Sequence, residues 1–393
     1  MADTKWKEGS IMKTTGVMMI GGLLIAGWII CSPALAFHEK SAESRIDELS
    51  RRIEDLERKP FNDETLSHWS DKITLSGLLE AEAGYSKFEP DAAGEADTEE
   101  SDITLSTFEL GLDVKLNEHV SGHALALWEE DDTEPMDLDE GFITFTGTDD
   151  IPAYLHAGKL YVPFGVYDTV FISDPFTLEL GETRESAVFA GYHPEMVDVF
   201  AGVFNGDVDE LGKKNHINSF FTGFTCGLPE DDARDFELAA GLSYLSNMAD
   251  SDGLSEFNDL DGDGAPDGIN DAVGGLAAHL SLELKESVTF TVEYVGALDD
   301  FKAGDLAFAP EGDTIRPAAW TTEISFMGSS HVGCGLKYEG TDDCGDFLPE
   351  TGYGCTVFCH PFECARLGLE YQYQEYANND INQGVTTQLA VEF

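Results

Sequence analysis

The segment Ala365–Gln374, ARLGLEYQYQ, alternates between apolar or aromatic residues and residues that are polar or glycine. Successive side chains of a β-strand point to opposite faces, so this period of two predicts a strand with one apolar face and one polar face. A tilted strand of about 9–11 residues crosses the hydrocarbon core of a bilayer. The segment is therefore long enough to be a membrane-spanning strand.

The same alternation recurs through most of the chain from Ile73 onward. Clear examples are Phe108–Lys115, Phe236–Tyr244, Leu280–Lys285 and Val288–Tyr294. We count about 16 candidate strands by this criterion. A soluble β-sandwich would also alternate, but strands in globular proteins average only about 5–6 residues. The predicted fold is therefore all-β, a transmembrane antiparallel β-barrel of about 16 strands that occupies residues 73–393.

The connections between these strands go long, short, long, short. Long connections include 87–101, 130–137, 162–183, 206–216, 247–272 and 300–316, and short ones include 117–118, Glu286 and 328–329. Segment 227–234 is intermediate and breaks the pattern. Long surface loops at one end and tight periplasmic turns at the other are typical of outer-membrane barrels, which close because every backbone group in lipid must be paired.

The amino-terminal residues have the pattern of an export signal. Lys5, Lys7 and Lys13 precede an apolar run from Gly16 to Cys31, and Ala34-Leu35-Ala36 fits a cleavage site after Ala36. We predict that residues 1–36 are a signal peptide and that the protein is exported to a Gram-negative outer membrane. The alternative is an uncleaved membrane anchor.

Residues 37–72 are expected to form a short helical lead in the periplasm. Ile46, Leu49, Ile53 and Leu56 follow a heptad seam, and Pro60 ends the helix. Two heptads are too short to associate alone, but they could support chains that are already held together. We expect a homotrimer, with a helix that lies on its own barrel as the alternative use of this segment.

The charge balance limits the partners. Lys and Arg total 22 of the 393 residues and Asp and Glu total 76, which gives a formal net charge of -54. This balance argues against a nucleic-acid partner, because phosphate binding needs a basic face. Acidic loops such as 89–102 and 129–140 could bind divalent ions that bridge lipopolysaccharide, or they are simply solvated.

A barrel of 16 strands leaves an aqueous channel, and the alternation predicts which residues line it. The predicted lumen carboxylates are Glu80, Glu82, Glu109, Asp113, Glu237, Glu283, Glu293, Glu323 and Glu370, and only Lys115, Lys285 and Arg366 oppose them. A negative pore wall predicts a modest preference for cations. The alternative is a solvated lumen without selectivity.

Segment 162–183, VPFGVYDTVFISDPFTLELGET, is apolar and aromatic for an exposed loop. If it folds inward, it narrows the pore and buries its apolar side chains. The competing interpretation is that it forms a contact within an oligomer.

One long loop has the spacing of a calcium site. Asp259, Asp261, Asp263 and Asp267 occupy positions 1, 3, 5 and 9 of a calcium-binding loop, with Gly264 at position 6. The bidentate Glu expected at position 12 is replaced by Asn270. We expect a structural Ca²⁺ ion here, and the alternative is a flexible acidic loop without metal.

The cysteines and histidines are the remaining candidates for chemistry. Cys359 and Cys364 flank a tight turn, so a cross-strand disulfide between them is the simplest pairing in an oxidising compartment. A zinc site formed by Cys355, Cys359, His360 and Cys364 is a weaker alternative. The sequence contains no G-x-S-x-G nucleophile motif and its histidines are scattered, so we predict that the protein is not an enzyme.

Four segments carry a resemblance to a known family: Ala157–Gly165 (AGKLYVPFG), 73–85 (ITLSGLLEAEAGY), 139–145 (DEGFITF) and the terminal Leu389–Phe393. Together with the helical lead, they resemble the LbtU-type siderophore porins, relatives of the phosphate-selective porins O and P. The resemblance implies passive uptake of a ferric siderophore or another small solute, without a plug domain. A ladder of lumen Lys and Arg, as phosphate selectivity would require, is lacking. The alternative function is a calcium-binding surface-display or adhesive barrel without a transport role.

Overall fold

The computed structural model describes residues 72–393, except for 93, 95, 131–134, 215, 229–234, 261, 263–264, 286, 310–311 and 330. The predicted signal peptide lies outside these described residues, as does the predicted helical lead up to residue 71. Within the described part, no helix is both long enough and apolar enough to cross a membrane.

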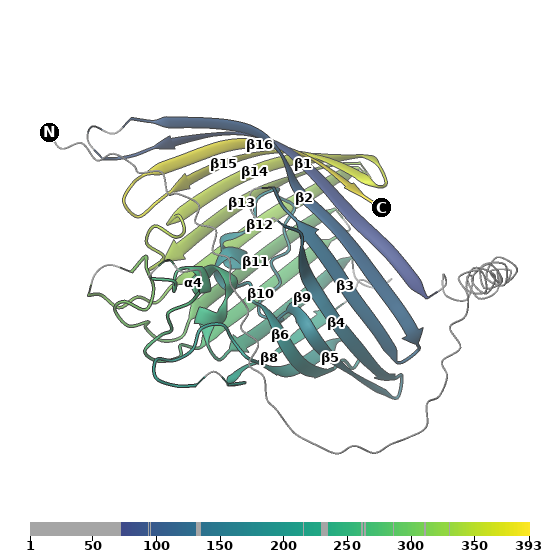
Figure 1. The fold of residues 1–393 in the computed structure, drawn as a ribbon. Coiled ribbons are helices and arrows are strands. Elements are labelled where there is room, and N and C mark those ends of the chain that lie inside the picture. Colours follow the sequence, from purple (N-terminus) through teal and green to yellow (C-terminus); the bar gives the residue numbers. More distant parts are fainter. Residues whose placement is uncertain are drawn as a thin grey trace, which may run out of the picture. The chain divides into compact units, whose positions relative to one another are not determined.

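Within the described residues, sixteen β-strands form a closed barrel, in which consecutive strands pair antiparallel and β16 returns to β1 (Figure 1). The strands are β1 (Ile73–Glu89), β2 (Thr98–Asn117), β3 (Val120–Trp128), β4 (Asp137–Thr148), β5 (Ile151–Tyr161), β6 (Arg184–Tyr192), β7 (Val197–Phe204), β8 (Ser219–Leu228), β9 (Phe236–Leu245), β10 (Gly275–Leu284), β11 (Val288–Ala297), β12 (Ala318–Ser329), β13 (Val332–Asp342), β14 (Thr351–Phe362), β15 (Ala365–Glu375) and β16 (Ile381–Glu392). The predicted fold is confirmed. Closure pairs the strand edges that an open sheet would leave unpaired.

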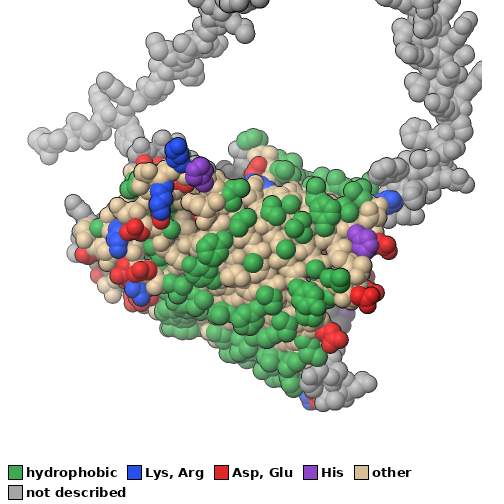
Figure 2. All heavy atoms as spheres, turned by 90° about the horizontal axis from the view of Figure 1, so that it is seen from below, with side chains coloured by type: hydrophobic (Ala, Val, Ile, Leu, Met, Phe, Trp, Pro, Cys, Tyr) green, Lys and Arg blue, Asp and Glu red, His purple; other side chains and the backbone are tan. Residues whose placement is uncertain are grey.

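The two faces of the barrel wall differ as the alternation predicts. On β13, Leu336 and Tyr338 are 62% and 41% exposed, whereas their neighbours Lys337 and Glu339 are 4% and 2% exposed. Figure 2 shows hydrophobic side chains gathered across the middle of the outer surface, with charged side chains toward either end. An apolar outer band with charged ends suits a barrel that is embedded in lipid.

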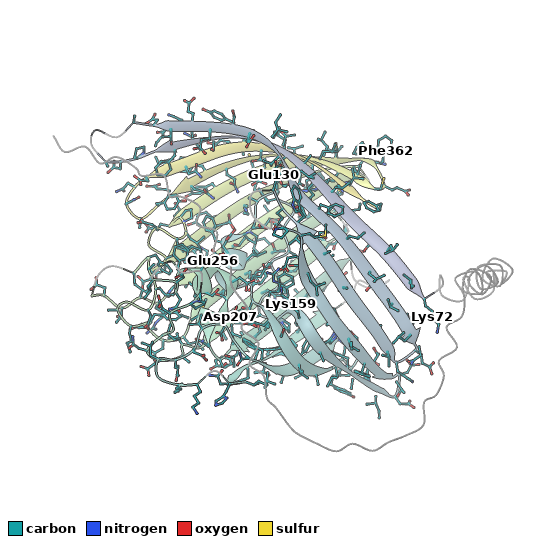
Figure 3. The ribbon with its side chains drawn as sticks, in the orientation of Figure 1. Lys72, Glu130, Lys159, Asp207, Glu256 and Phe362 are labelled. Carbon is teal, nitrogen blue, oxygen red and sulfur yellow. The ribbon has the colours of Figure 1, made fainter. Side chains whose placement is uncertain are left out.

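The connections alternate in length along the chain, as predicted. The long connections lie at the end of the barrel that carries Asp207 and Glu256, and the opposite end carries Lys72 and Phe362 (Figure 3). Short helical segments occur within two of the long connections: α3 (Phe176–Gly181), η1 (Met248–Asp250) and α4 (Asp252–Glu256). One end of the barrel therefore carries the long connections and helical segments, and we call it the elaborate end; the other end carries short turns.

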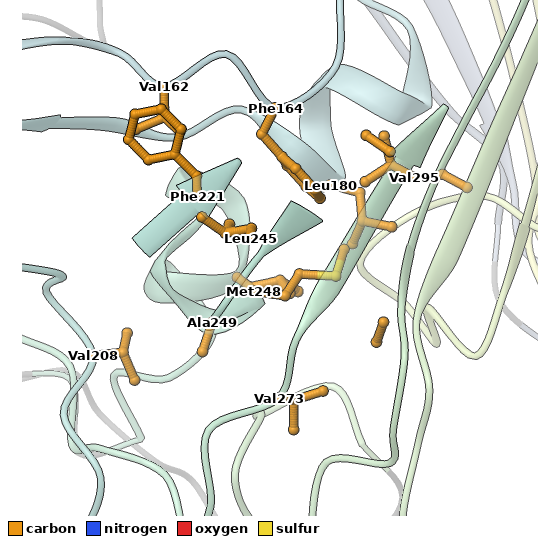
Figure 4. Close-up of a cluster of buried hydrophobic side chains, with 14 of the residues drawn as sticks. Val162, Phe164, Leu180, Val208, Phe221, Leu245, Met248, Ala249, Val273 and Val295 are labelled. Atoms are coloured by element: carbon orange, nitrogen blue, oxygen red, sulfur yellow. The ribbon is translucent and has the colours of Figure 1, made fainter. Parts of the chain in front are cut away.

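A hydrophobic core lies where long connections meet the inner face of the barrel. Phe164 and Leu180 of segment 162–183 pack in one cluster with Leu245 of β9, Met248 of η1 and Val295 of β11 (Figure 4). All five side chains are fully buried. The long connections are thus held by apolar burial, which contributes roughly 1.5–3 kcal/mol for each large side chain.

Cys359 and Cys364 are free thiols in the structure, and the disulfide between them remains a prediction. β14 continues past the expected turn to Phe362, which lies opposite Ala365, and Leu367 lies opposite Cys359. Cys364 consequently lies in the turn between β14 and β15, out of register with Cys359. The turn therefore lies later in the chain than the sequence pattern indicated.

Candidate functional site in the barrel interior

Segment 162–183, which we call the inner loop, connects β5 to β6 but crosses the interior of the barrel. Its residues bond to side chains of β9, β11, β12, β13 and β15, and several of these strands lie on the other side of the ring from β5. The aromatic side chains of Phe171 and Phe176 are each 4% exposed. Of the two interpretations of this segment, the structure shows the inward fold that buries its apolar side chains.

Glutamates on two neighbouring strands bind the first half of the inner loop. The carboxylate of Glu293 on β11 accepts hydrogen bonds from the backbone N–H groups of Val166 (2.7 Å) and Tyr167 (3.0 Å). The carboxylate of Glu323 on β12 accepts from the Thr169 hydroxyl (2.7 Å) and the Val170 N–H (3.1 Å). Charge-assisted bonds of this kind are stronger than bonds between neutral groups.

Two further glutamates bind the next part of the loop. Glu370 on β15 accepts hydrogen bonds from the backbone N–H groups of Ile172 and Ser173 and from the Ser173 hydroxyl. Glu339 on β13 accepts from the Phe176 N–H at 3.0 Å. We call Glu293, Glu323, Glu339 and Glu370 the carboxylate clamp. Their exposed fractions are 8%, 4%, 2% and 2%.

Lys337 is the cation at the centre of the clamp. Its ammonium group lies 3.1 Å from the Glu339 carboxylate and donates hydrogen bonds to the backbone oxygen (3.3 Å) and the hydroxyl (3.1 Å) of Ser173. It also lies 4.9 Å from the centre of the Phe171 ring. A buried ion pair needs such additional bonds to offset its loss of hydration. Lys337 therefore belongs to the attachment of the inner loop.

The structure divides the predicted lumen carboxylates. Glu293, Glu323 and Glu370 are buried against the inner loop, whereas Glu80, Glu82 and Glu109 are only half-buried. Sequence reasoning missed Glu339 and Lys337 as interior residues. The signal was available, because both alternate with the exposed side chains of β13.

Two cavities lie along the wall formed by β1, β2, β15 and β16. One has a volume of about 540 Å³ and is lined by Ser76, Leu78, Glu109, Gly111, Glu363 and Glu392, among others. The other has a volume of about 480 Å³, and its lining includes Ser86, Glu100, Asp102, Gln372, Gln374 and Asn382. Between them on β1 lie Glu80 and Glu82, and Gln388 of β16 donates a hydrogen bond to Glu82 at 3.0 Å. Space therefore remains along this wall while the clamp holds the loop to β11, β12, β13 and β15.

Asp174 is an exposed residue of the inner loop, and charges on the barrel wall affect its pKa. Desolvation by the surrounding protein raises the pKa of Asp174, Lys337 lowers it, and Glu129 and Glu82 raise it further. Glu82 belongs to β1, and Glu129 follows β3 directly. The pKa of Asp174 therefore responds to carboxylates of the barrel wall.

The remaining predicted lumen residues lie at separate places on the barrel wall. Asp113 accepts a hydrogen bond from the His123 ring at 2.8 Å, Glu237 lies opposite Glu283 across β9 and β10, and Lys115 is exposed near the end of β2. The Arg366 guanidinium donates to the backbone oxygen of Val170 in the inner loop and lies 4.9 Å from the Phe358 ring. Arg366 is therefore engaged by the loop as well.

Only part of the predicted calcium loop is described, because Asp261 and Asp263 lie outside the described residues. Asp259 accepts a hydrogen bond from the Gly262 N–H and Asp267 accepts one from the Leu260 N–H, both at 2.8 Å. These bonds fold the loop back on itself. Among the residues that the structure does describe, no three His, Cys, Asp or Glu side chains are grouped as metal ligands.

Comparison with known sequences finds distant relatives. No protein-family model matches the chain. A UPF0422 protein of Coxiella burnetii is 28% identical over 329 residues, which cover 80% of this chain and 66% of that protein. A UPF0422 protein of Legionella pneumophila is 26% identical over 341 residues, covering 79% and 62%. The chain thus spans less than two thirds of the length of these curated relatives.

Comparison with solved structures identifies the class of fold. The outer membrane channel DcaP of Acinetobacter baumannii has a TM-score of 0.55 at 12% identity, covering 82% of this chain and 97% of that one. The anion-selective porin from Comamonas acidovorans has a TM-score of 0.55 at 12% identity, covering 82% and 99%. The chain therefore has the barrel fold of outer-membrane porins and channels.

Proposed function

We propose that the protein is an outer-membrane channel through which small solutes diffuse passively, with a preference for cations. The observation that carries this proposal is the pair of cavities along β1, β2, β15 and β16. The porin-like fold supports a passage through the barrel. The passage needs no moving domain, because diffusion follows the solute gradient.

The cation preference follows from the charges along this passage. Glu80, Glu82 and Glu109 are half-buried on the wall, and Asp174 approaches from the inner loop. The nearest cations, Lys337 and Arg366, are bonded to the inner loop. Rings of carboxylates favour cations and repel anions at short range. The anion-selective porin from Comamonas acidovorans has the same fold. The acidic side chains on the barrel wall of this chain would give it the opposite selectivity.

The resemblance to LbtU-type porins refines the solute to a ferric siderophore or a molecule of similar size. An acidic passage favours a solute that is neutral or positively charged over an anionic one. We further propose export by the signal peptide 1–36, assembly as a homotrimer, and contact of the acidic loops with lipopolysaccharide through divalent ions.

The decisive experiment is single-channel recording of the purified protein in a planar bilayer, under a KCl gradient. We expect stepwise openings in groups of three and a reversal potential that reports cation preference. Stable insertion without any conductance would overturn the channel. A reversal potential of the opposite sign would instead overturn the assignment of the acidic wall.

A second candidate function is a barrel that displays a calcium-binding loop at the cell surface. It is favoured by the position of Asp259 and Asp267 in a long connection at the elaborate end of the barrel. We expect Ca²⁺ to slow proteolysis of connection 247–272 and chelation to reverse the effect. The variant Asp259→Asn with Asp267→Asn provides the control, and equal cleavage of both proteins with and without Ca²⁺ would reject the site.

A further inference from the structure

The acidic residues on the inner face fall into two groups with different surroundings. The clamp carboxylates are nearly inaccessible, and their oxygens accept hydrogen bonds from the inner loop. Glu80 and Glu82 are half-buried on β1, between Leu78, which lines one cavity, and Gly84, which lines the other. Alternation along a strand puts both groups on the same face, so their difference comes from the path of the inner loop.

The carboxylate clamp supplies hydrogen-bond acceptors to the backbone of the inner loop. The segment crosses the interior without pairing to a strand, so its backbone N–H groups need acceptors from side chains. The bonds are spread along the loop from Val166 to Phe176, and each clamp residue comes from a different strand. Four attachment points on different strands fix the position of the inner loop inside the barrel.

We propose that Glu293, Glu323, Glu339 and Glu370 are positioning residues that hold the inner loop across the barrel, whereas Glu80 and Glu82 determine ion selectivity. This inference rests on the proposed channel function and deepens it. A clamp carboxylate with bonded oxygens and almost no exposure has little contact with a passing ion. A half-buried carboxylate beside the passage acts on the ion directly.

The test compares Glu370→Gln and Glu323→Gln with the matched variant Glu82→Gln. Gln keeps the shape of Glu, but its amide is a hydrogen-bond donor and faces the N–H donors of the loop. We expect the clamp variants to show greater open-channel current noise and subconductance states, with the reversal potential unchanged. Glu82→Gln should shift the reversal potential toward zero and leave the noise unchanged.

Hydrogen exchange of the detergent-folded protein provides a readout that does not depend on conductance. A hydrogen bond to a charged group is worth enough to change an opening equilibrium by about tenfold to a hundredfold. We expect the amides of residues 166–176 to exchange at least about tenfold faster in the clamp variants. Exchange of this segment should be unchanged in Glu82→Gln.

An engineered disulfide between the inner loop and β15 should reverse the effect of Glu370→Gln on current noise. A Cβ atom at Gly368 would lie 3.4 Å from Cγ1 of Ile172, which is within the reach of a disulfide between cysteines at the two positions. Ile172→Cys with Gly368→Cys, in a background in which the native cysteines are serine, should suppress the noise of Glu370→Gln. Reduction should restore the noise, and the lock should not restore the selectivity lost in Glu82→Gln.

The outcomes separate this inference from the channel proposal. If the clamp variants shift the reversal potential as much as Glu82→Gln and leave exchange unchanged, their carboxylates act on ions and the inference is wrong. If even the parent protein does not conduct, the channel proposal and the assignment of selectivity both fail. In that case, faster exchange of residues 166–176 in the clamp variants still supports the positioning role, and unchanged exchange rejects it.

Discussion

At the scale of single residues, the ring of Phe393 depends on the absence of a side chain at Gly77. The two residues exchange backbone hydrogen bonds of 2.9 and 3.0 Å and extend the pairing that closes the barrel between β1 and β16. The Phe393 ring lies over Gly77, and a Cβ atom there would come within 2.3 Å of it. The aromatic ring covers the gap that a glycine leaves in a strand.

We predict that Gly77→Val weakens the closure of the barrel. The added side chain must displace the Phe393 ring, and overpacking of this kind typically costs about 1–3 kcal/mol. The measurement is urea unfolding of the refolded barrel in lipid vesicles. Gly84→Ala on the same strand is the control, because a Cβ atom there meets nothing within 4 Å. Equal stability of the two variants would contradict the role of this contact.

Glu182, which follows α3, gives a residue-scale prediction about pH. The pKa of Glu182 is raised to about 8, mainly by burial and further by the charges of Asp252, Asp174 and Asp139, while Arg184 opposes the shift. Because this pKa lies above the ordinary value of 4.5, its contribution to stability is fully present at low pH and is lost as the pH rises through about 8. Glu182→Gln should therefore lose less thermal stability between pH 5 and pH 9 than the parent protein.

The melting temperature in detergent across this pH range is the measurement for Glu182→Gln. Glu118→Gln is a suitable control, because the Glu118 side chain is 85% exposed in the turn between β2 and β3. The prediction fails if the parent and Glu182→Gln have parallel stability curves.

At the scale of elements, the inner loop is held by two kinds of interaction. The carboxylate clamp binds its backbone, and the hydrophobic core binds α3 through Phe176 and Leu180. Six residues are too few to form a stable helix alone, so α3 depends on this packing. The hydrogen bonds fix where the loop lies, and the apolar contacts make its inward position stable.

We predict that Leu180→Ala destabilises the inner loop. Leu180 is fully buried close to Phe164 and Val295 (Figure 4), and such a truncation typically costs about 2–5 kcal/mol. Limited proteolysis of the folded protein should show faster cleavage within residues 162–183. Val166→Ala is the control, because Val166 is 41% exposed and binds Glu293 through its backbone. Unchanged cleavage in Leu180→Ala would show that the clamp alone is sufficient.

At the scale of the whole molecule, the acidic wall should act on ions through its summed field. The Debye length falls from about 10 Å at 0.1 M salt to about 3 Å at 1 M. We therefore predict that cation preference weakens as the KCl concentration rises over this range, as measured by the reversal potential at a constant gradient. A preference that is independent of salt would point to direct contact in a narrow site. Uptake of a neutral sugar into vesicles should not change with salt.

The sequence by itself determined the all-β barrel, its strand count and its two kinds of connection. Alternation in segments such as Ala365–Gln374 reflects a local rule, because a strand exposes its residues to lipid and interior in turn. The apolar composition of 162–183 likewise predicted burial. These properties depend on residues that are near each other along the chain.

Only the tertiary structure decided which interior carboxylates bind the inner loop and which remain beside the passage. Glu82 and Glu370 follow the same alternation, but Glu370 accepts a hydrogen bond from Ser173 of the inner loop, whereas Glu82 accepts one from Gln388 on the neighbouring strand β16. The position of Cys364 in a turn likewise follows from where β14 ends and β15 begins. Periodicity assigns a side chain to a face, whereas its partner depends on where distant segments meet in the folded chain.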